Sequence, residues 1–305
     1  VQRDASGRQV WEARWAGYGS AVTADPAGNV LAAGGGLRKY DLSGRLLWTE
    51  ELEQAFVLAL TVDSAGNVLA AGSTPTDIGS DFLTAKLSSN GKLLWSARYH
   101  GDGGPRDNEL YNQATDIAVD PQGNVHVTGE SYEFRQSYDY ATIKYDSEGN
   151  QLWVARYQGE LVSGSDTPSA LALGPDGGVH VTGSSSGPTG YPDFTTVKYN
   201  TQGTELWVRR YADPENRSRT ATAIAVDAAG GVYVAGSSPG PGPGPGPGTG
   251  AALVKYDSNG KELWARREFQ SAAGSYMTDA ALAVDLALDP AENAILSAIS
   301  PDPAP

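Results

Sequence analysis

Two stretches decide the fold, DIAVDPQGNVHVTGES (116–131) and ATIKYDSEGNQLW (141–153). In the first, apolar residues alternate on both sides of a D-x-x-G-N turn, which is typical of two short strands joined by a tight turn. In the second, a strand ending in Lys-Tyr leads through a D-S-x-G turn into a strand that carries tryptophan. Together the two hairpins predict a unit of four antiparallel strands.

This unit is repeated along the whole chain. The first signature recurs at 21–35, 59–73, 116–131, 170–185, 223–238 and, in a divergent form, 286–300. The second recurs at 37–48, 83–95, 141–153, 195–207, 252–264 and, shortened at its front, 1–11. Four strands per repeat at this spacing indicate the blades of a propeller, because one small sheet cannot bury both of its faces alone.

The sequence therefore predicts an all-β, six-bladed β-propeller with four antiparallel strands per blade, forming a single domain over 1–299. Five blades are predicted at about 21–52, 56–99, 114–157, 169–211 and 221–268. The sixth combines 281–299 with 1–15, so that N-terminal outer strands pair with C-terminal inner strands and close the ring. Residues 300–305 are interpreted as a Pro-rich tail that acts as a linker.

Composition limits the classes of partner. A net charge of −14 disfavours binding to nucleic acid or to anionic membranes. The chain has no cysteine, which excludes disulfides and thiolate metal sites. No apolar run approaches the roughly 20 residues of a membrane span, and no signal peptide is visible. The first residue is Val1 rather than methionine, which fits either a processed or truncated form or an arbitrary boundary.

The strings DPQGNVHVTGES and YDSEGNQLW resemble the bacterial β-propeller repeats known as SBBP repeats, and the D-x-x-G-N-V turn is similar to that of NHL repeats. The tryptophan strand also resembles, more weakly, the blade motif of quinoprotein dehydrogenases. The resemblance covers nearly the whole chain, although Glu292 replaces the turn glycine in the last copy. It implies a propeller and an exported bacterial protein, located extracellularly, at the cell surface or in the periplasm. It implies little about function.

The recurring turn and strand residues are interpreted as structural. The turn glycines suit positive φ, and the turn aspartates can accept amide hydrogen bonds. A calcium loop is the alternative for these aspartates, but the turns lack an alternating run of oxygen ligands. We expect neither a metal nor a cofactor. One tryptophan per repeat predicts packing between blades; these residues are Trp11, Trp48, Trp95, Trp153, Trp207 and Trp264.

Register arguments predict cross-strand ion pairs in the outer hairpins. If the D-S-x-G turn has four residues, an aspartate near the start of one strand faces an arginine near the end of the next. The predicted pairs are Asp81–Arg98, Asp139–Arg156 and Asp193–Arg210, whereas Arg267 faces Gly250. Each pair is expected to contribute roughly 0.2–1 kcal/mol. A bulge in the turn would shift the pairing.

The three histidines give no catalytic signature. His126 and His180 occupy a second-strand position held by Leu31, Leu69 and Tyr233 in other repeats, which favours packing. His100 lies alone in a connection. No catalytic residue is therefore predicted.

Long connections between strands are the predicted binding surface, because variable loops on a rigid scaffold often carry function. The candidate residues are Arg106, Asp107, Tyr111, Tyr132, Phe134, Arg135, Tyr138 and Tyr191. Two interpretations stay open for these aromatic residues: they bind a partner, or they pack their own loops. The run PGPGPGPGPGTG (239–250) is expected to be an extended, mobile loop.

Three functional hypotheses follow. The leading one is a non-catalytic, exported interaction module that presents one rim to a protein or a polysaccharide. The second is a lyase or hydrolase with a site near the central channel. The third is a structural subunit of a surface layer or filament.

Overall fold

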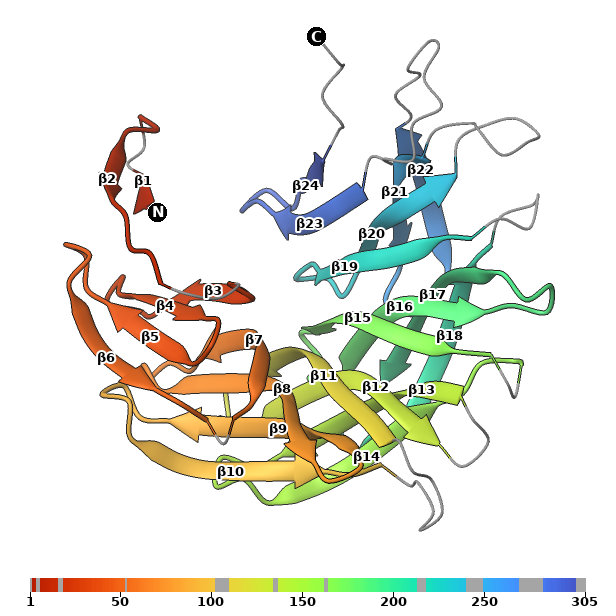
Figure 1. Ribbon diagram of the computed structural model, residues 1–305. Coiled ribbons are helices and arrows are strands. Elements are labelled where there is room, and N and C mark those ends of the chain that lie inside the picture. Colours follow the sequence, from red (N-terminus) through yellow and green to blue (C-terminus); the bar gives the residue numbers. More distant parts are fainter. Residues whose placement is uncertain are drawn as a thin grey trace, which may run out of the picture. The chain divides into compact units, whose positions relative to one another are not determined.

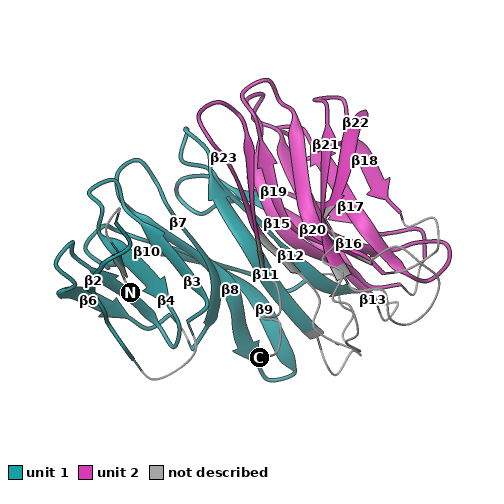
Figure 2. Ribbon diagram, turned by 90° about the horizontal axis from the view of Figure 1, so that it is seen from above, with its two compact units in different colours: residues 1–134, 143–152 teal, residues 135–142, 153–305 magenta. Residues whose placement is uncertain are grey.

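The computed structural model describes residues 2–3, 6–15, 19–52, 54–101, 110–133, 137–161, 164–212, 218–239, 249–268 and 282–299. Every regular element within them is a β-strand (Figure 1). The described residues contain no helix that could cross a bilayer. The chain divides into two compact units, residues 1–134 with 143–152 and residues 135–142 with 153–305 (Figure 2).

Most strands of unit 1 belong to two sheets. One is a four-stranded sheet of β3 (Ala21–Ala24), β4 (Val30–Ala33), β5 (Leu37–Tyr40) and β6 (Leu46–Glu50). The other has eight strands: β7 (Phe56–Val62), β8 (Val68–Thr76), β9 (Gly79–Leu87), β10 (Leu93–Tyr99), β11 (Leu110–Val119), β12 (Val125–Glu133), β13 (Ser137–Tyr145) and β14 (Gln151–Tyr157). It consists of two antiparallel four-stranded sets joined by a short parallel contact between β9 and β11, and the boundary between the units runs through β13 and β14.

Unit 2 contains two further four-stranded sheets. The first is β15 (Asp166–Leu173), β16 (Val179–Ser186), β17 (Pro192–Tyr199) and β18 (Glu205–Tyr211). The second is β19 (Thr220–Val226), β20 (Val232–Pro239), β21 (Thr249–Tyr256) and β22 (Glu262–Glu268). Both are antiparallel throughout, so the predicted all-β class with antiparallel sheets is confirmed.

The terminal segments form two small hairpins. β1 (Gln2–Arg3) pairs with β2 (Gln9–Trp11), and β23 (Leu282–Leu288) pairs with β24 (Ala294–Ile299). Each is a two-stranded sheet. Their union into one blade stays a prediction, as do the count of six blades and the single domain over 1–299.

Four of the repeated tryptophans pack on the turn of the next four-stranded set or sheet. The indole Nε1 of Trp95 donates to the carbonyl oxygen of Ser147, in the next D-S-x-G turn, at 3.0 Å. Gly149 of that turn has φ +88°, and a Cβ added there would lie 2.6 Å from the Trp95 ring. Equivalent indole bonds join Trp48 to Ser89 at 3.2 Å, Trp153 to Thr201 at 3.1 Å and Trp207 to Ser258 at 3.3 Å. The turn needs glycine both for its backbone and for this close approach.

The D-x-x-G-N turns are fixed by their aspartates. Both carboxylate oxygens of Asp25 accept hydrogen bonds within the turn, from the amides of Ala27 and Asn29 and from the Asn29 side chain, each at 2.9 Å. Lys39, from the third strand of the same sheet, lies 2.8 Å away and is buried with it. Lys86–Asp63, Lys144–Asp120 and Lys255–Asp227 repeat the pair at 3.1–3.4 Å. In the fourth repeat Gly174 takes the place of the aspartate, and Lys198 instead contacts Asp176 at 2.7 Å. Protein donors thus occupy these carboxylates, which supports the structural interpretation over a calcium loop.

Candidate functional site

The outer hairpins do not have the predicted register. Arg210 lies opposite Thr195, and Arg98 lies opposite Leu83, two residues away from Asp193 and Asp81. The prediction of directly opposite pairs is wrong because the turn has five residues and a β-bulge follows it. In β17–β18 the amide of Asn200 donates to the carbonyl oxygen of Thr204, and the register then shifts once more. A shift of two residues keeps side chains on the same face.

Aspartate and arginine therefore meet diagonally. Arg210 Nη1 lies 3.6 Å from Asp193 Oδ2, and Arg156 Nη2 lies 3.6 Å from Asp139 Oδ2. The Asp193 and Asp139 side chains are buried, so these pairs differ from surface ion pairs, and removing one partner would leave a costly buried charge. The pairing of Asp81 with Arg98 stays a prediction.

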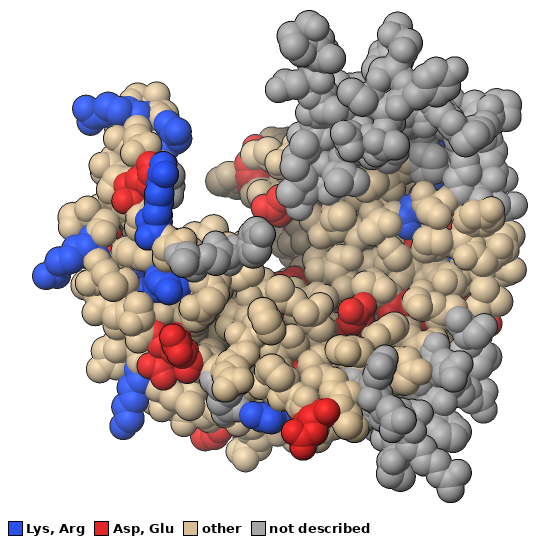
Figure 3. All heavy atoms as spheres, in the orientation of Figure 1, with Lys and Arg blue, Asp and Glu red and all other residues tan. Residues whose placement is uncertain are grey.

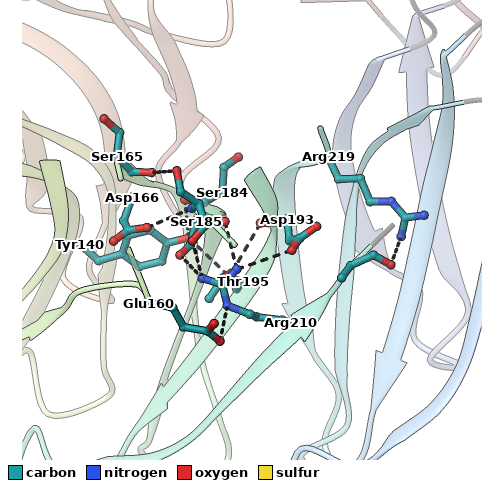
Figure 4. Close-up of polar contacts among 12 residues, drawn as sticks. Tyr140, Glu160, Ser165, Asp166, Ser184, Ser185, Asp193, Thr195, Arg210 and Arg219 are labelled. Atoms are coloured by element: carbon teal, nitrogen blue, oxygen red, sulfur yellow. Dashed lines mark hydrogen bonds and ion pairs between the residues drawn. The ribbon is translucent and has the colours of Figure 1, made fainter. Parts of the chain in front are cut away.

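In unit 2, Arg210 is the centre of a polar cluster, which we call the β15–β18 cluster (Asp166, Ser185, Asp193 and Arg210). Arg210 donates to the Ser185 carbonyl oxygen at 3.2 Å and, through Nη2, to Ser185 Oγ at 2.5 Å. Its Nε lies 3.8 Å from a carboxylate oxygen of Glu160. Figure 4 shows the guanidinium reaching between these groups. Positive and negative charges are thus paired within this cluster.

Asp166 holds the segment that leads into its sheet. Its fully buried carboxylate accepts from the amide of Gly159 at 2.5 Å and from that of Ser186 at 3.2 Å. Burial raises the pKa of Asp166 above its ordinary value, although hydrogen bonds from Ser185 and from these amides oppose the shift. The carboxylate thus serves to anchor the backbone.

Unit 1 contains the same arrangement with a neutral residue. Asn112 lies opposite Ser131 in β11–β12, as Asp166 lies opposite Ser185 in β15–β16. Its side-chain oxygen accepts from Ser131 Oγ at 2.8 Å, and its amide donates to the His100 carbonyl oxygen at 3.0 Å. In both cases a polar residue at this position bonds to the connecting segment that precedes its strand.

An open depression of about 430 Å³ lies beside the β15–β18 cluster. Tyr157, Gln158, Gly159, Glu160, Val208 and Arg210 line it. Arg210, the basic side chain of this lining, is already engaged by Ser185, Asp193 and Glu160.

Two of the predicted binding residues, Tyr111 and Tyr132, lie in unit 1, at a sheet end that also carries other exposed apolar side chains. Tyr111, at the start of β11, is 51% exposed and pairs with Ser80 of β9. Tyr132 of β12 is half-buried and directly follows Ser131, the partner of Asn112, so continued antiparallel pairing would place it opposite Tyr111. Phe56, 70% exposed at the start of β7, and Ile78, 50% exposed between β8 and β9, lie at the same strand ends. We call Phe56, Ile78 and Tyr111 the aromatic strand end; sequence reasoning missed Phe56 and Ile78.

The other candidates are distributed differently. In unit 2, Tyr191 is 51% exposed in the turn between β16 and β17, and Tyr138 is half-buried at the start of β13. Arg106, Asp107, Phe134 and Arg135 lie outside the described residues.

The histidines occupy contrasting environments. His126 and His180 are fully buried, and burial lowers the pKa of each to about 4. The ring of His180 packs against Trp207 with centroids 5.8 Å apart. The His100 side chain is 71% exposed, and its Nδ1 lies 2.8 Å from Asp81 Oδ1. Within the described part of the chain, no three His, Asp or Glu side chains gather as a metal site would require.

Charge is dispersed on the face drawn in Figure 3. Acidic and basic side chains stand singly or in small groups among neutral ones. Among the described residues drawn on that face, the basic side chains do not merge into a broad surface suited to a nucleic-acid backbone.

Comparison with known proteins supports the fold. The chain is similar to the family described as outer membrane protein assembly factor BamB, whose model matches residues 1–131. The Dos1 propeller structure is similar with a TM-score of 0.52 at 11% identity, over 89% of this chain and 62% of that one. The chain is a β-propeller repeat protein. A crystal structure of a protein of unknown function from Bacteroides caccae has a TM-score of 0.49 at 17% identity, covering 86% of this chain and 87% of that chain. No curated protein sequence matches.

Proposed function

We propose that this β-propeller is a non-catalytic interaction module that holds a protein or polysaccharide partner at the variable ends of its strands. The observation that carries the proposal is the aromatic strand end of unit 1. Phe56, Ile78 and Tyr111 expose large apolar side chains at one end of a sheet whose opposite end consists of short, tightly bonded turns. Exposed aromatic residues among polar backbone ends are typical of recognition surfaces.

The proposal includes a complete ring. Six blades are supported by six copies of each sequence signature. β1–β2 carries the second signature and β23–β24 the first, so each hairpin has the half of a four-stranded unit that the other lacks. We propose that they pair to close one domain over 1–299, with repeats of the SBBP type.

We also propose that the protein is exported, to the periplasm, the cell surface or the medium. Two points support this: the sequence resemblance to exported repeat proteins, and the family match, whose description names an outer membrane assembly factor.

The structural environment of the titratable groups favours binding over catalysis. Two of the three histidines are buried with depressed pKa values, and the carboxylates of the turns and of the β15–β18 cluster anchor backbone or pair with cations. The third histidine, His100, is exposed and lies 2.8 Å from Asp81 Oδ1, but within the described residues no third His, Asp or Glu joins this pair to form a metal-binding group.

The test is a binding assay on the intact chain, using an array of bacterial polysaccharides and a panel of periplasmic and outer-membrane proteins. The double variant Phe56→Ser/Tyr111→Ser should lose the retained ligand. Leu152→Ser, which changes an equally exposed apolar residue on the outer strand β14, should retain it. All should melt at nearly the same temperature, since exposed substitutions usually change stability by less than about 0.5 kcal/mol. Equal retention by both variants would contradict the proposed surface.

A further inference from the structure

The sheet β19–β22 repeats the arrangement of β15–β18, but an arginine replaces one of its aspartates and a glycine replaces the other. Ser238 lies opposite Gly250 in β20–β21, as Ser185 lies opposite Asp193 in β16–β17. Arg219 directly precedes Thr220, whose partner is Ser237, so Arg219 holds the place of Asp166. Arg267 holds the place of Arg210. We call Arg219, Ser238, Gly250 and Arg267 the β19–β22 cluster.

The connecting segment is tied in the same way, but with donor and acceptor exchanged. In the β15–β18 cluster the carboxylate of Asp166 accepts from the backbone of Gly159. In the β19–β22 cluster, Nη1 of Arg219 donates to the carbonyl oxygen of Ala212 at 3.0 Å. An anion has therefore been replaced by a buried cation, with only 1% of Arg219 exposed.

The second arginine of the β19–β22 cluster has lost the carboxylate of its own hairpin. Arg210 faces Asp193, whereas Arg267 has Gly250 in the corresponding place. Arg267 Nε instead donates to the hydroxyl of Tyr211 at 2.7 Å. The guanidiniums of Arg267 and Arg219 lie 5.3 and 4.5 Å from the centroid of this one tyrosine ring. Two positive charges thus converge beside a position where the neighbouring sheet supplies an aspartate.

A buried hydroxyl marks the same position. Ser238 is fully buried, and among the described residues its Oγ has no hydrogen-bond partner. The matching Ser185 Oγ accepts from Arg210 and bonds with Asp166. A buried hydroxyl without a partner costs about 1–3 kcal/mol, so such a group normally bonds to protein, to ordered water or to a bound ligand.

We propose that the β19–β22 cluster binds a carboxylate group of an external ligand in the place that Asp193 occupies in the neighbouring sheet. Arg267 would pair with the carboxylate in fork geometry, as arginine commonly does, and Ser238 Oγ would donate to it. The site is distinct from the aromatic strand end, and its failure would leave the proposed function intact.

The probe is glucuronate, with acetate as a smaller carboxylate and glucose as the uncharged control. Isothermal titration of the intact chain, in low-salt buffer without carboxylates, should show binding of glucuronate and acetate but not of glucose. Arg267→Gln should weaken glucuronate binding by about tenfold or more, the loss expected for one charge-assisted bond. Sulfate or chloride binding as tight as glucuronate would overturn the carboxylate assignment.

A second variant separates loss of the site from loss of the fold. Gly250→Asp restores the carboxylate that the neighbouring sheet has, and because Gly250 lies in a paired strand the change requires no unusual backbone conformation. It should abolish glucuronate binding and raise the melting temperature in the absence of ligand. Undiminished binding in Gly250→Asp, or no carboxylate binding by the unaltered chain, would overturn the proposal.

Discussion

Replacing Gly149 with alanine tests whether tryptophan packing on the next turn joins successive four-stranded sets. Gly149 has φ +88°, and an added Cβ would lie 2.6 Å from the ring of Trp95. Alanine in this conformation costs about 1–2 kcal/mol on its own. The collision requires the indole or the turn to move, which adds about 1–3 kcal/mol by analogy with overpacked cores. We therefore expect Gly149→Ala to lower the free energy of unfolding by about 2–5 kcal/mol.

Gly123 offers a matched control in the same set of strands. Its φ is +83°, but its nearest neighbour to an added Cβ is the Ser147 side chain at an ordinary 3.5 Å. Gly123→Ala should therefore cost only the backbone contribution. Urea titrations followed by circular dichroism would give both changes, and Trp95→Leu should reduce the difference between them. Equal losses for Gly123→Ala and Gly149→Ala would refute the packing argument.

Two predictions concern pH. Burial alone would raise the pKa of Asp25, but hydrogen bonds from Lys39 and Asn29 outweigh it and hold the pKa at about 2. This pair should stabilise the fold above pH 3.8 and lose its effect as pH falls toward 2. Asp25→Asn should therefore be less stable than the unaltered chain at pH 6 but lose less stability on acidification. Thermal unfolding measured across this pH range would show both effects. The pKa values of His126 and His180 are depressed to about 4 in the folded protein, so protonation of the unfolded chain should destabilise the fold progressively from pH 6.5 down to about 4. NMR titration should show both imidazoles neutral at pH 5.5. A midpoint near 6.5 for either histidine would contradict the burial described here.

The strands and turns could be predicted from sequence because each repeat contains the same alternation of apolar residues around the same turn signatures. Alternation around Asp120 and Gly123 specifies a tight turn without reference to the rest of the chain. The register of the outer hairpins could not be predicted, since the extra turn residue and the bulge before Trp207 leave no separate mark in the sequence. A shift of two residues nevertheless preserved which side chains share a face.

The candidate sites depended on packing between distant residues. The exposure of Phe56 follows from its place at the start of a strand, whereas its sequence context resembles that of core residues. The contrast between Asp193 and Gly250 was visible in the sequence as an arginine facing glycine. The proposed binding site could be recognised only from the positions of two further residues. Arg219 lies in the connection before β19, and Tyr211 ends β18 of the preceding sheet.

The closure of the ring is tested most directly by a disulfide between the terminal hairpins. Gln2 lies opposite Trp11, as Lys198 lies opposite Trp207 in the sheet β15–β18. In that sheet Lys198 also pairs with His180, and Ile295 holds the equivalent place in β24. A closed ring therefore places Gln2 opposite Ile295. Directly opposed strand residues have Cα atoms about 4.5–5.5 Å apart, within the range of a disulfide. The natural chain has no cysteine, so Gln2→Cys/Ile295→Cys adds the only two thiols. The account predicts rapid intramolecular cross-linking that is independent of protein concentration, with little in a Gln2→Cys/Leu152→Cys control. Equal slow oxidation of both variants, or cross-linking only between molecules, would contradict it.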